Sequence, residues 1–377
     1  MIYITLIIIF LSVLSGWFIL WKVPLIHLNH RKDLKSKKLS IIIPARNEEK
    51  NLPILLKSLQ NQHLQPDEIL VVDDDSEDKT VEIAKKYGAR VVQFPTGESD
   101  WVGKSAACFY GAKEATGDCF FFLDADIFLP EPSSLGRILA EFQEEKGPNV
   151  LSIQPYHMVE KLYEHLSVVF NLLVLAGMNR FSVLEEKLQP AGAFGPSLLV
   201  DRNTYFRVGG HKRARGSIME NIDLGKIFLE DDVPVHLYGG KGSLHFRMYP
   251  EGYSSLAEGW SKSFVSGSKA THPLILFGTI LWISGAFISP LFAVYGSIQG
   301  DLLVMILSAL GYLLYYVQFL RMTAIAGNFR PWVMLFYPLF FVYFILLFTW
   351  SAIKTKIFKR VSWKGREITL KEEENGE

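Results

Sequence analysis

Long apolar runs lie at both ends of the chain, and the middle alternates short apolar runs with amphipathic ones. Residues 2–21 carry no charged side chain. About 20 apolar residues are enough for a helix to cross the hydrocarbon core of a bilayer. The run shows neither the basic start nor the small-residue cleavage site of a secretory signal. We therefore predict an uncleaved N-terminal transmembrane anchor, residues 1–24.

Basic residues follow this anchor directly. Between Lys22 and Lys38 the chain holds six lysines and arginines against a single acid, Asp33. Basic flanks of membrane helices are retained on the cytoplasmic side. The pattern predicts a multi-pass protein of the cell membrane whose central domain faces the cytoplasm.

Three apolar runs form a predicted C-terminal membrane region, residues 273–353, preceded by an interfacial helix over 256–272. The runs lie at roughly 274–296, 302–320 and 331–353. If all three crossed the membrane, the tail over 354–377 would lie outside. That tail, however, opens with six lysines and arginines before its acidic end, which indicates the inside. One run is therefore expected to be re-entrant or interfacial, and the sequence does not say which.

The middle of the chain alternates strand and helix patterns. Strands are expected over 38–45, 67–76, 89–95 and 119–126, and helices over 51–62, 78–88 and 103–117. Such alternation is typical of an α/β fold with a Rossmann-like, mostly parallel sheet. The apolar run 166–178 is too short to span a bilayer, so we expect a helix packed on the domain or on the membrane surface.

Carboxylates follow two of the expected strands. Asp73, Asp74 and Asp75 end one strand, and Asp124 and Asp126 end another. In an open parallel sheet, ligands bind outside the carboxyl ends of the strands. The two acidic clusters are therefore expected to face one crevice.

Asp124 and Asp126 could hold a divalent cation, because Mg²⁺ and Mn²⁺ take oxygen ligands and complete their shells with water and substrate phosphates. Such a cation would neutralise a departing diphosphate. A solvated turn can carry the same spacing, although the buried strand before it argues against that alternative. Lys104 opens a helix and could meet a phosphate or face solvent. His211 or His245 could add a ligand or be structural.

Composition narrows the classes of function. The 39 basic and 39 acidic side chains balance, which argues against a nucleic-acid binder. The two cysteines, Cys108 and Cys119, match no metal spacing and are expected to be reduced, buried thiols.

Four motifs in one order carry a family resemblance. The stretches IIIPARNEE, VVDDDSEDKT, DWVGKSAACFYGAKEATGD and FFFLDADIF resemble the donor half of family 2 glycosyltransferases with the GT-A fold. The resemblance covers about residues 38–260 and implies a GT-A domain over 38–255, a UDP-sugar donor and inversion at the anomeric carbon. It implies a divalent cation, Mg²⁺ or Mn²⁺, at Asp126 with Asp124. The donor-binding residues that we expect are Pro44, Ala45, Asn47, Glu48, Asp73, Asp74, Lys104, Asp124 and Arg247.

The acceptor half departs from the family pattern. A Glu-Asp pair whose aspartate is the general base normally follows the glycine-rich acceptor segment, but here Glu220 is followed by Asn221. An amide accepts no proton at neutral pH. Glu220 or Asp223 could have taken the role of base. Alternatively, the acceptor could be a carboxylate, which is already ionised and needs no base. Glu220, Asn221 and Asp223 are the candidate catalytic residues.

The segment GAFGPSLLVDRNTYFRVGGH and the layout of apolar runs resemble family members that glycosylate membrane lipids, among them those acting on C30 carotenoid acids. The expected reaction moves a hexose, glucose, from a UDP-sugar to the carboxylate of such a lipid-soluble acid, with Gly192, Phe194 and Trp260 near the acceptor. The Q-x-x-R-W signature of polymer synthases is absent. The alternatives are transfer to a glycerolipid, hopanoid or polyprenyl phosphate, or a non-catalytic membrane scaffold.

Overall fold

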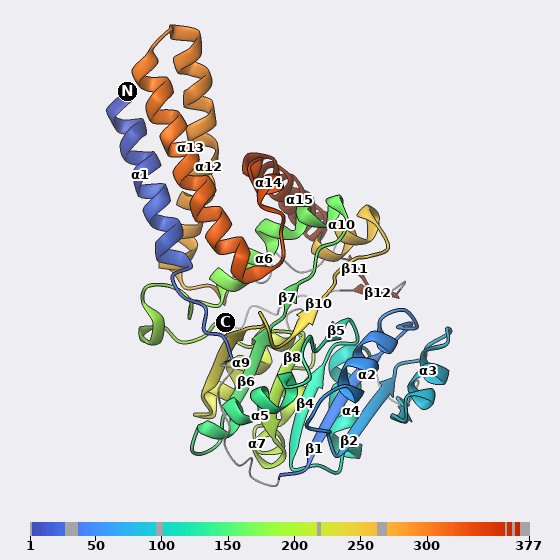
Figure 1. The fold of residues 1–377 in the computed structure, drawn as a ribbon. Coiled ribbons are helices and arrows are strands. Elements are labelled where there is room, and N and C mark those ends of the chain that lie inside the picture. Colours follow the sequence, from blue (N-terminus) through green and yellow to red (C-terminus); the bar gives the residue numbers. More distant parts are fainter. Residues whose placement is uncertain are drawn as a thin grey trace.

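The computed structural model describes residues 2–26, 37–95, 101–216, 220–261, 270–358, 360–363 and 366–369. An α/β domain lies below a bundle of long helices (Figure 1). Within the described residues, seven strands form one sheet in the order β3-β2-β1-β4-β8-β6-β9. The pairs β1–β2, β2–β3, β1–β4 and β6–β9 are parallel, and β8 runs antiparallel to β4 and β6. The predicted α/β fold with a mostly parallel sheet is confirmed.

The strands of this sheet are β1 (Leu39–Ala45), β2 (Glu68–Asp73), β3 (Arg90–Gln93), β4 (Cys119–Leu123), β6 (Val150–Gln154), β8 (Ser197–Asp201) and β9 (Val235–Gly239). The helices of the domain are α2 (Leu52–Gln60), α3 (Thr80–Lys86), α4 (Lys104–Glu114), α5 (Ser134–Glu144), α7 (Arg202–Arg207), α8 (Gly210–Arg213) and α9 (Glu220–Glu230). A small second sheet joins β5 (Ile127–Phe128), β10 (His245–Phe246) and β7 (Tyr156–His157). The short elements η1 (Leu162–Ser167), η2 (Glu185–Lys187), β11 (Arg360–Trp363) and β12 (Arg366–Thr369) complete the order.

The central strands bury both faces, which explains their unbroken apolar runs. Successive side chains of a strand point to opposite faces. In β4, Phe120 and Phe122 join one apolar core, and Phe121 joins the other. Polar groups can therefore follow such a strand only where it leaves the sheet, and Asp124 is the first residue after β4.

The order of the strands creates a crevice. The chain runs outward from β1 through β2 to β3 and then returns to the other side of β1 as β4. The carboxyl ends of β1 and β4 therefore flank the point where the strand order reverses. Ligands of open α/β sheets bind at such switch points.

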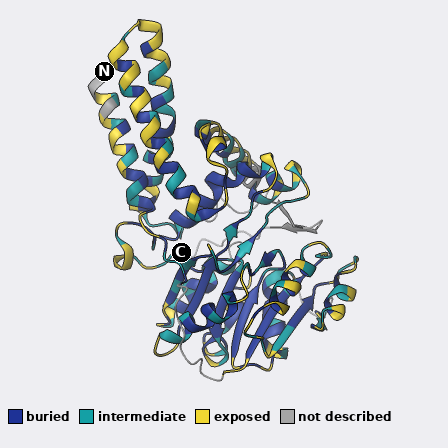
Figure 2. Ribbon diagram, viewed as in Figure 1, coloured by how far each residue is buried: buried dark blue, intermediate teal, exposed yellow. Residues whose placement is uncertain are grey.

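The long helices are α1 (Ile2–Ile19), α12 (Pro273–Gln299) and α13 (Leu302–Ala326), which stand side by side (Figure 1). By length and composition, α12 and α13 could each cross a membrane. Their outer faces are exposed, whereas the strands of the domain are buried (Figure 2). Four further helices lie beside the lower half of this bundle: α6 (Val168–Gly177), α10 (Tyr253–Ser261), α14 (Pro331–Met334) and α15 (Tyr337–Phe358). The predicted short helix over 166–178 is thus present as α6, and it is mostly buried.

Candidate active site

A cleft opens at the carboxyl ends of β1 and β4. Seven of the predicted site residues line it together: Pro44, Ala45, Glu48, Asp74, Lys104, Asp124 and Asp126. Arg46, Ala107 and Ala125 line it as well, although the sequence did not mark them as site residues. The only signal for Arg46 was its place inside the PARNEE motif, and the two alanines leave room for a ligand.

The charges of the cleft favour a cation. Its lining holds four acids, Glu48, Asp74, Asp124 and Asp126, and two bases, Arg46 and Lys104, so its formal charge is 2 − 4 = −2. A diphosphate entering alone would meet net repulsion. No three His, Cys, Asp or Glu side chains gather as a metal cage anywhere in the described part of the chain. Two carboxylates without a closed cage fit Mg²⁺ or Mn²⁺, which keep positions for water and substrate phosphates.

Lys104 lines this cleft and pairs with Asp124. Its Nζ is 2.6 Å from Asp124 Oδ1 and 2.8 Å from Oδ2, and it donates to the Gly195 carbonyl at 2.9 Å. Burial opposes its charge, but the charge and hydrogen bond of Asp124, together with the other groups nearby, outweigh burial and raise the pKa of Lys104. Lys104 therefore stays an ammonium group and neutralises Asp124. The sequence had linked it only to a phosphate or to solvent.

Hydrogen bonds fasten the loop after β1 to the loop after β2. The Asn47 amide donates to Ser76 Oγ at 3.0 Å, and Asn47 Oδ1 accepts from the Glu77 amide at 2.8 Å. The Glu48 amide donates to Thr80 Oγ1 at 2.7 Å. Asn47 has a φ of 53°, a left-handed conformation that asparagine tolerates better than most residues. The structure thus gives Asn47 a role in holding the loops, and its side chain does not line the cleft.

Arg46 and Asp73 are buried next to the same two loops and form hydrogen bonds with the loop after β2. Arg46 is buried, and its Nη1 donates to the Asp74 carbonyl at 2.8 Å. Asp73 is buried too, and its Oδ2 accepts from the Ser76 amide at 3.4 Å. Among the described residues, no hydrogen-bond donor reaches Asp73 Oδ1. Asp73 lies next to the cleft lining and keeps one acceptor oxygen for a further donor.

Glu220, at the start of α9, lies beside the cleft wall. Its Oε1 accepts from Ser105 Oγ at 2.6 Å, and Ser105 follows Lys104 at the start of α4. Trp101 Nε1 in turn donates to Ser105 Oγ at 3.2 Å. Burial raises the pKa of Glu220, against the lowering effects of the Ser105 hydrogen bond and the Lys104 charge. Its carboxylate is therefore a better proton acceptor than that of an ordinary glutamate.

The first turn of α9 packs directly on the glycine-rich segment 192–195. A Cβ on Gly192 would lie 2.3 Å from the Ile222 carbonyl oxygen, and one on Gly225 would lie 2.1 Å from the Ala193 amide. Only glycine permits this approach of two backbones. A Cβ on Gly195 would similarly lie 2.9 Å from Asn221 Nδ2. Because the Gly195 carbonyl holds Lys104, Asn221 connects to the charged cleft through this segment.

Three further candidates do not line the cleft. Asp223 pairs with Lys226 at 3.2 Å along α9. Phe194 is buried and stacks on Phe181, with ring centroids 6.2 Å apart. Trp260 is buried and stacks on Phe170 at 4.9 Å. The two aromatic residues that were expected to contact an acceptor thus lie in the apolar core.

Arg247 comes near Asp126 in the backbone but turns its side chain away. Phe246 pairs with Ile127 across the antiparallel strands β10 and β5, so the same register sets the next residue, Arg247, opposite Asp126. The guanidinium instead lies 2.6 Å from Glu160 Oε2 and 2.9 Å from Glu164 Oε1.

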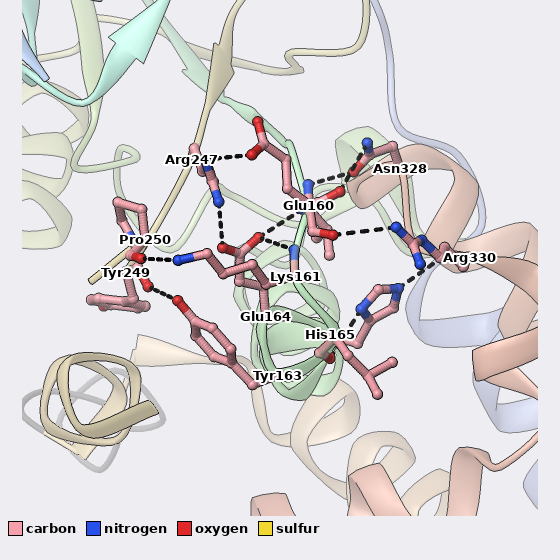
Figure 3. A network of polar contacts seen from close by, with 12 residues as sticks. Glu160, Lys161, Tyr163, Glu164, His165, Arg247, Tyr249, Pro250, Asn328 and Arg330 are labelled. Atoms are coloured by element: carbon pink, nitrogen blue, oxygen red, sulfur yellow. Dashed lines mark hydrogen bonds and ion pairs between the residues drawn. The ribbon is translucent and has the colours of Figure 1, made fainter. Parts of the chain in front are cut away.

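These contacts form part of a polar network (Figure 3). Glu164 is fully buried, and its Oε2 also accepts from the amides of Glu160 and Lys161. Arg330, which follows α13, donates from Nη2 to the Glu160 carbonyl at 3.2 Å. The network therefore joins the strand beside Asp126 to the end of the helix bundle, and Arg247 does not reach the cleft lining.

The two histidines considered as ligands are packed among aromatic rings. His211 is buried against Phe122, and its Nδ1 lies 2.8 Å from Tyr205 Oη. Burial lowers the pKa of His211 to about 3. His245 lies between Phe128 and Tyr156, and its pKa is lowered by burial to about 4. Neither lines the cleft.

Comparison with known proteins gives three findings. Residues 40–206 match the model of glycosyl transferase family 2. The chain is 36% identical over 354 residues, 92% of this chain and 94% of the relative, to the 4,4'-diaponeurosporenoate glycosyltransferase of Staphylococcus aureus (strain USA300). It is 37% identical over 368 residues, 96% of each chain, to the protein of that name from Staphylococcus haemolyticus (strain JCSC1435).

A solved structure shares the fold over almost the whole chain. It is the mannosyltransferase from Pyrobaculum calidifontis in complex with GDP-Man and Mn²⁺. The match covers 95% of this chain and 100% of that one, with 16% identity and a TM-score of 0.53. This likeness extends the similarity of fold to the helices that lie outside the sheet domain.

Proposed function

Because this chain belongs to glycosyl transferase family 2 and is a sugar transferase with the GT-A fold, we propose that it glycosylates a carotenoid acid. It would move glucose from UDP-glucose to the carboxylate of a C30 acid of the 4,4'-diaponeurosporenoate type, with inversion at the anomeric carbon. The relatives of that name match nearly the whole chain. The observation that carries the proposal is the charged cleft between β1 and β4.

Both the acidic and the basic residues of the cleft would bind the donor. Asp126, with Asp124, would hold Mg²⁺ or Mn²⁺, which when bound offsets the negative charge of the diphosphate. The solved mannosyltransferase contains Mn²⁺ and a nucleotide sugar, which agrees with such a site. Lys104 neutralises Asp124, so Asp126 would contribute most of the negative charge at the cation site. The unused acceptor oxygen of Asp73 suits a donor group of the nucleoside.

The acceptor side fits a group that arrives ionised. A carboxylate oxygen of the acid would form a bond to the anomeric carbon while the bond from that carbon to the diphosphate breaks, and UDP departs with the electron pair. No proton moves in this step, so no base is required. Asn221 would hold the acceptor carboxylate through its amide N–H groups, where an aspartate would repel it. Glu220 is the residue that would serve as base for a hydroxyl acceptor.

We further propose that α1, α12 and α13 cross the cell membrane and that the GT-A domain, residues 38–255, faces the cytoplasm. The lengths and apolar outer faces of α12 and α13 support this placement. The basic residues between Lys22 and Lys38 support the orientation. A carotenoid acid would then stay in the bilayer and present its polar end to the domain.

The test uses the purified full-length protein in lipid nanodiscs with UDP-glucose. The acceptor arms are 4,4'-diaponeurosporenoate, the corresponding alcohol and a polyprenyl phosphate, which is also ionised. We expect a glucose ester of the acid by mass spectrometry, little product from the alcohol, and loss of turnover on adding EDTA. If glucosylated polyprenyl phosphate is the only product, the acceptor is the polyprenyl phosphate and not the carotenoid acid. Equal use of the alcohol would contradict the role of Asn221.

A further inference from the structure

The third C-terminal apolar run begins where the chain has just returned to the sheet domain. After α13, Gly327 forms an isolated parallel bridge with His157, and the Asn328 amide donates to the His157 carbonyl at 3.0 Å. The Asn328 side chain also accepts from the Val159 amide at 2.5 Å. The end of α13 is therefore fixed to the domain, so the run that follows starts on the domain side.

The chain then runs back along α13, away from the domain. Tyr312 Oη of α13 donates to the Leu335 carbonyl at 2.5 Å, which lies just before α15. The ring of Tyr337, the first residue of α15, lies 4.7 Å from that of Tyr312 and stacks on Tyr315 at 5.7 Å. Tyr312 precedes the end of α13 by 14 residues, about 21 Å of helix. Because α13 has 25 residues, or about 38 Å, α15 begins near its middle.

From that height α15 returns to the domain. Phe344 meets Phe170 of α6 with ring centroids 5.1 Å apart. The ring centroid of Tyr343, the residue before Phe344, lies 6.1 Å from that of Tyr253 in α10. Further on, Ser351 Oγ donates to the Ser261 carbonyl at the end of α10. The direction of α15 is thus back toward the domain, although its 22 residues would be long enough, at about 33 Å, to cross a bilayer.

The outer face of α15 is apolar as well as the inner one. Tyr337, Phe341 and Phe344 are buried against the protein. On the opposite side, Leu339 is 64% exposed and Leu346 is 65% exposed. A helix that is apolar all round is covered by protein or by lipid. The outer faces of α12 and α13 carry exposed leucines and isoleucines too, so the apolar surface continues onto the neighbouring helices.

We infer that α14 and α15 form a re-entrant membrane segment, which enters the bilayer from the cytoplasmic side to about mid-depth and leaves on that same side. The occupant of the outer face of α15 is the lipid bilayer. Three helices, α1, α12 and α13, then cross, and the basic tail stays with the catalytic domain. This arrangement accounts for Arg330 just before the segment and for Lys354 and Lys356 near the end of α15, since basic residues at both ends obey the positive-inside rule. It rests on the proposed membrane placement of α12 and α13.

The test combines cysteine labelling with depth measurements in the full chain. Both native cysteines are buried, so Cys108→Ala with Cys119→Ala gives the background, checked for retained turnover. Gln299→Cys marks the connection between α12 and α13, and Lys371→Cys marks the tail. A membrane-impermeant maleimide applied to right-side-out vesicles should label Gln299→Cys directly and Lys371→Cys only after detergent. Labelling of the tail without detergent would overturn the inference.

Depth separates a re-entrant segment from a helix that lies flat on the membrane. A fluorophore on Leu339→Cys, near the start of α15, should be quenched more by a nitroxide at the middle of the acyl chain than by one near the headgroup. The same fluorophore on Ile353→Cys, near its end, should show the reverse. Equal, shallow quenching at both positions would overturn the re-entrant path. If Gln299→Cys also needs detergent, the proposed crossing of α12 and α13 fails instead, whatever the tail shows.

Discussion

Replacing Lys104 by methionine should move cation binding and turnover in opposite directions. Lys104 Nζ contacts both oxygens of Asp124, at 2.6 and 2.8 Å, and the two side chains are 27% and 28% exposed. A pair this close to solvent contributes about 1 kcal/mol. Without it, Asp124 can turn to a cation, and the formal charge of the cleft falls from −2 to −3. We expect Mn²⁺ to bind about fivefold more tightly, the equivalent of about 1 kcal/mol.

Turnover should fall despite the tighter cation. Lys104 carries a positive charge next to Asp124 and would donate a hydrogen bond to the donor phosphate. Hydrogen bonds between charged groups contribute about 1.5–3 kcal/mol. Loss of about 2–3 kcal/mol in the transition state lowers kcat/KM for the donor by roughly 30- to 150-fold. If Lys104 served only to bind donor phosphate and left Asp124 alone, the substitution would lower turnover without any gain in Mn²⁺ affinity.

The assay needs two readouts on one preparation. Calorimetric titration of Mn²⁺ into the protein without donor gives the cation affinity. The rate of UDP release in the presence of the carotenoid acid gives kcat/KM for the donor. Lys113→Met is the matched control, because Lys113 is an exposed lysine on the same helix, α4. The control should change neither value. Weaker Mn²⁺ binding in Lys104→Met, or unchanged turnover, would refute the reasoning from the Lys104–Asp124 pair.

Four further substitutions test other parts of the site. Asp126→Ala should abolish EDTA-sensitive turnover while the melting temperature of the protein stays close to that of the wild type; activity that persists would exclude this carboxylate as a ligand. Asn221→Asp should slow transfer to the carotenoid acid, since it adds a charge of the same sign as the acceptor, and a large gain in rate would instead indicate a missing base. Glu220→Gln should lower kcat by less than about tenfold, whereas loss of a general base lowers it roughly 10²- to 10⁴-fold. Burial raises the pKa of Glu220, so a base at this position would lose its activity on acidification at a pH above the usual glutamate range. If the wild type shows such a loss and Glu220→Gln does not, Glu220 is the base. Glu164→Gln should lower the free energy of unfolding by about 2–3 kcal/mol through its hydrogen bonds with charged groups, measured by denaturant titration near neutral pH.

The Glu164 effect should depend on pH with a definite sign. Burial alone would raise its pKa, but hydrogen bonds from the Glu160 and Lys161 amides and from Arg247 outweigh burial and lower it. A depressed folded-state pKa stabilises the protein above the unfolded value, roughly 4.3 for glutamate, and this stabilisation is lost as the pH falls through the folded value. The difference between wild type and Glu164→Gln should therefore shrink below about pH 4. A difference independent of pH would contradict the charged state of Glu164.

The sequence by itself determined the elements of the domain and the edge of the sheet where the chemistry lies. Unbroken apolar runs such as CFFFL specify strands buried on both faces, and the alternation with helices specifies parallel pairing. Since a charged group without a partner is costly inside such a strand, the acids Asp124 and Asp126 are expected where the strand ends. These conclusions follow from local rules, in which each residue is constrained by neighbours a few positions away.

Only the tertiary structure decided which side chains meet. Glu220 contacts Ser105 across 115 positions of sequence, and Arg247 turns to Glu160 and Glu164 although its backbone follows the strand beside Asp126. Trp260 was expected near the acceptor, yet it is buried in the apolar core. The direction of α15 was likewise open, because its length permits a crossing and its contacts at both ends determine its path. Pairings of this kind depend on packing between distant segments, which no local pattern of hydrophobic and polar residues encodes.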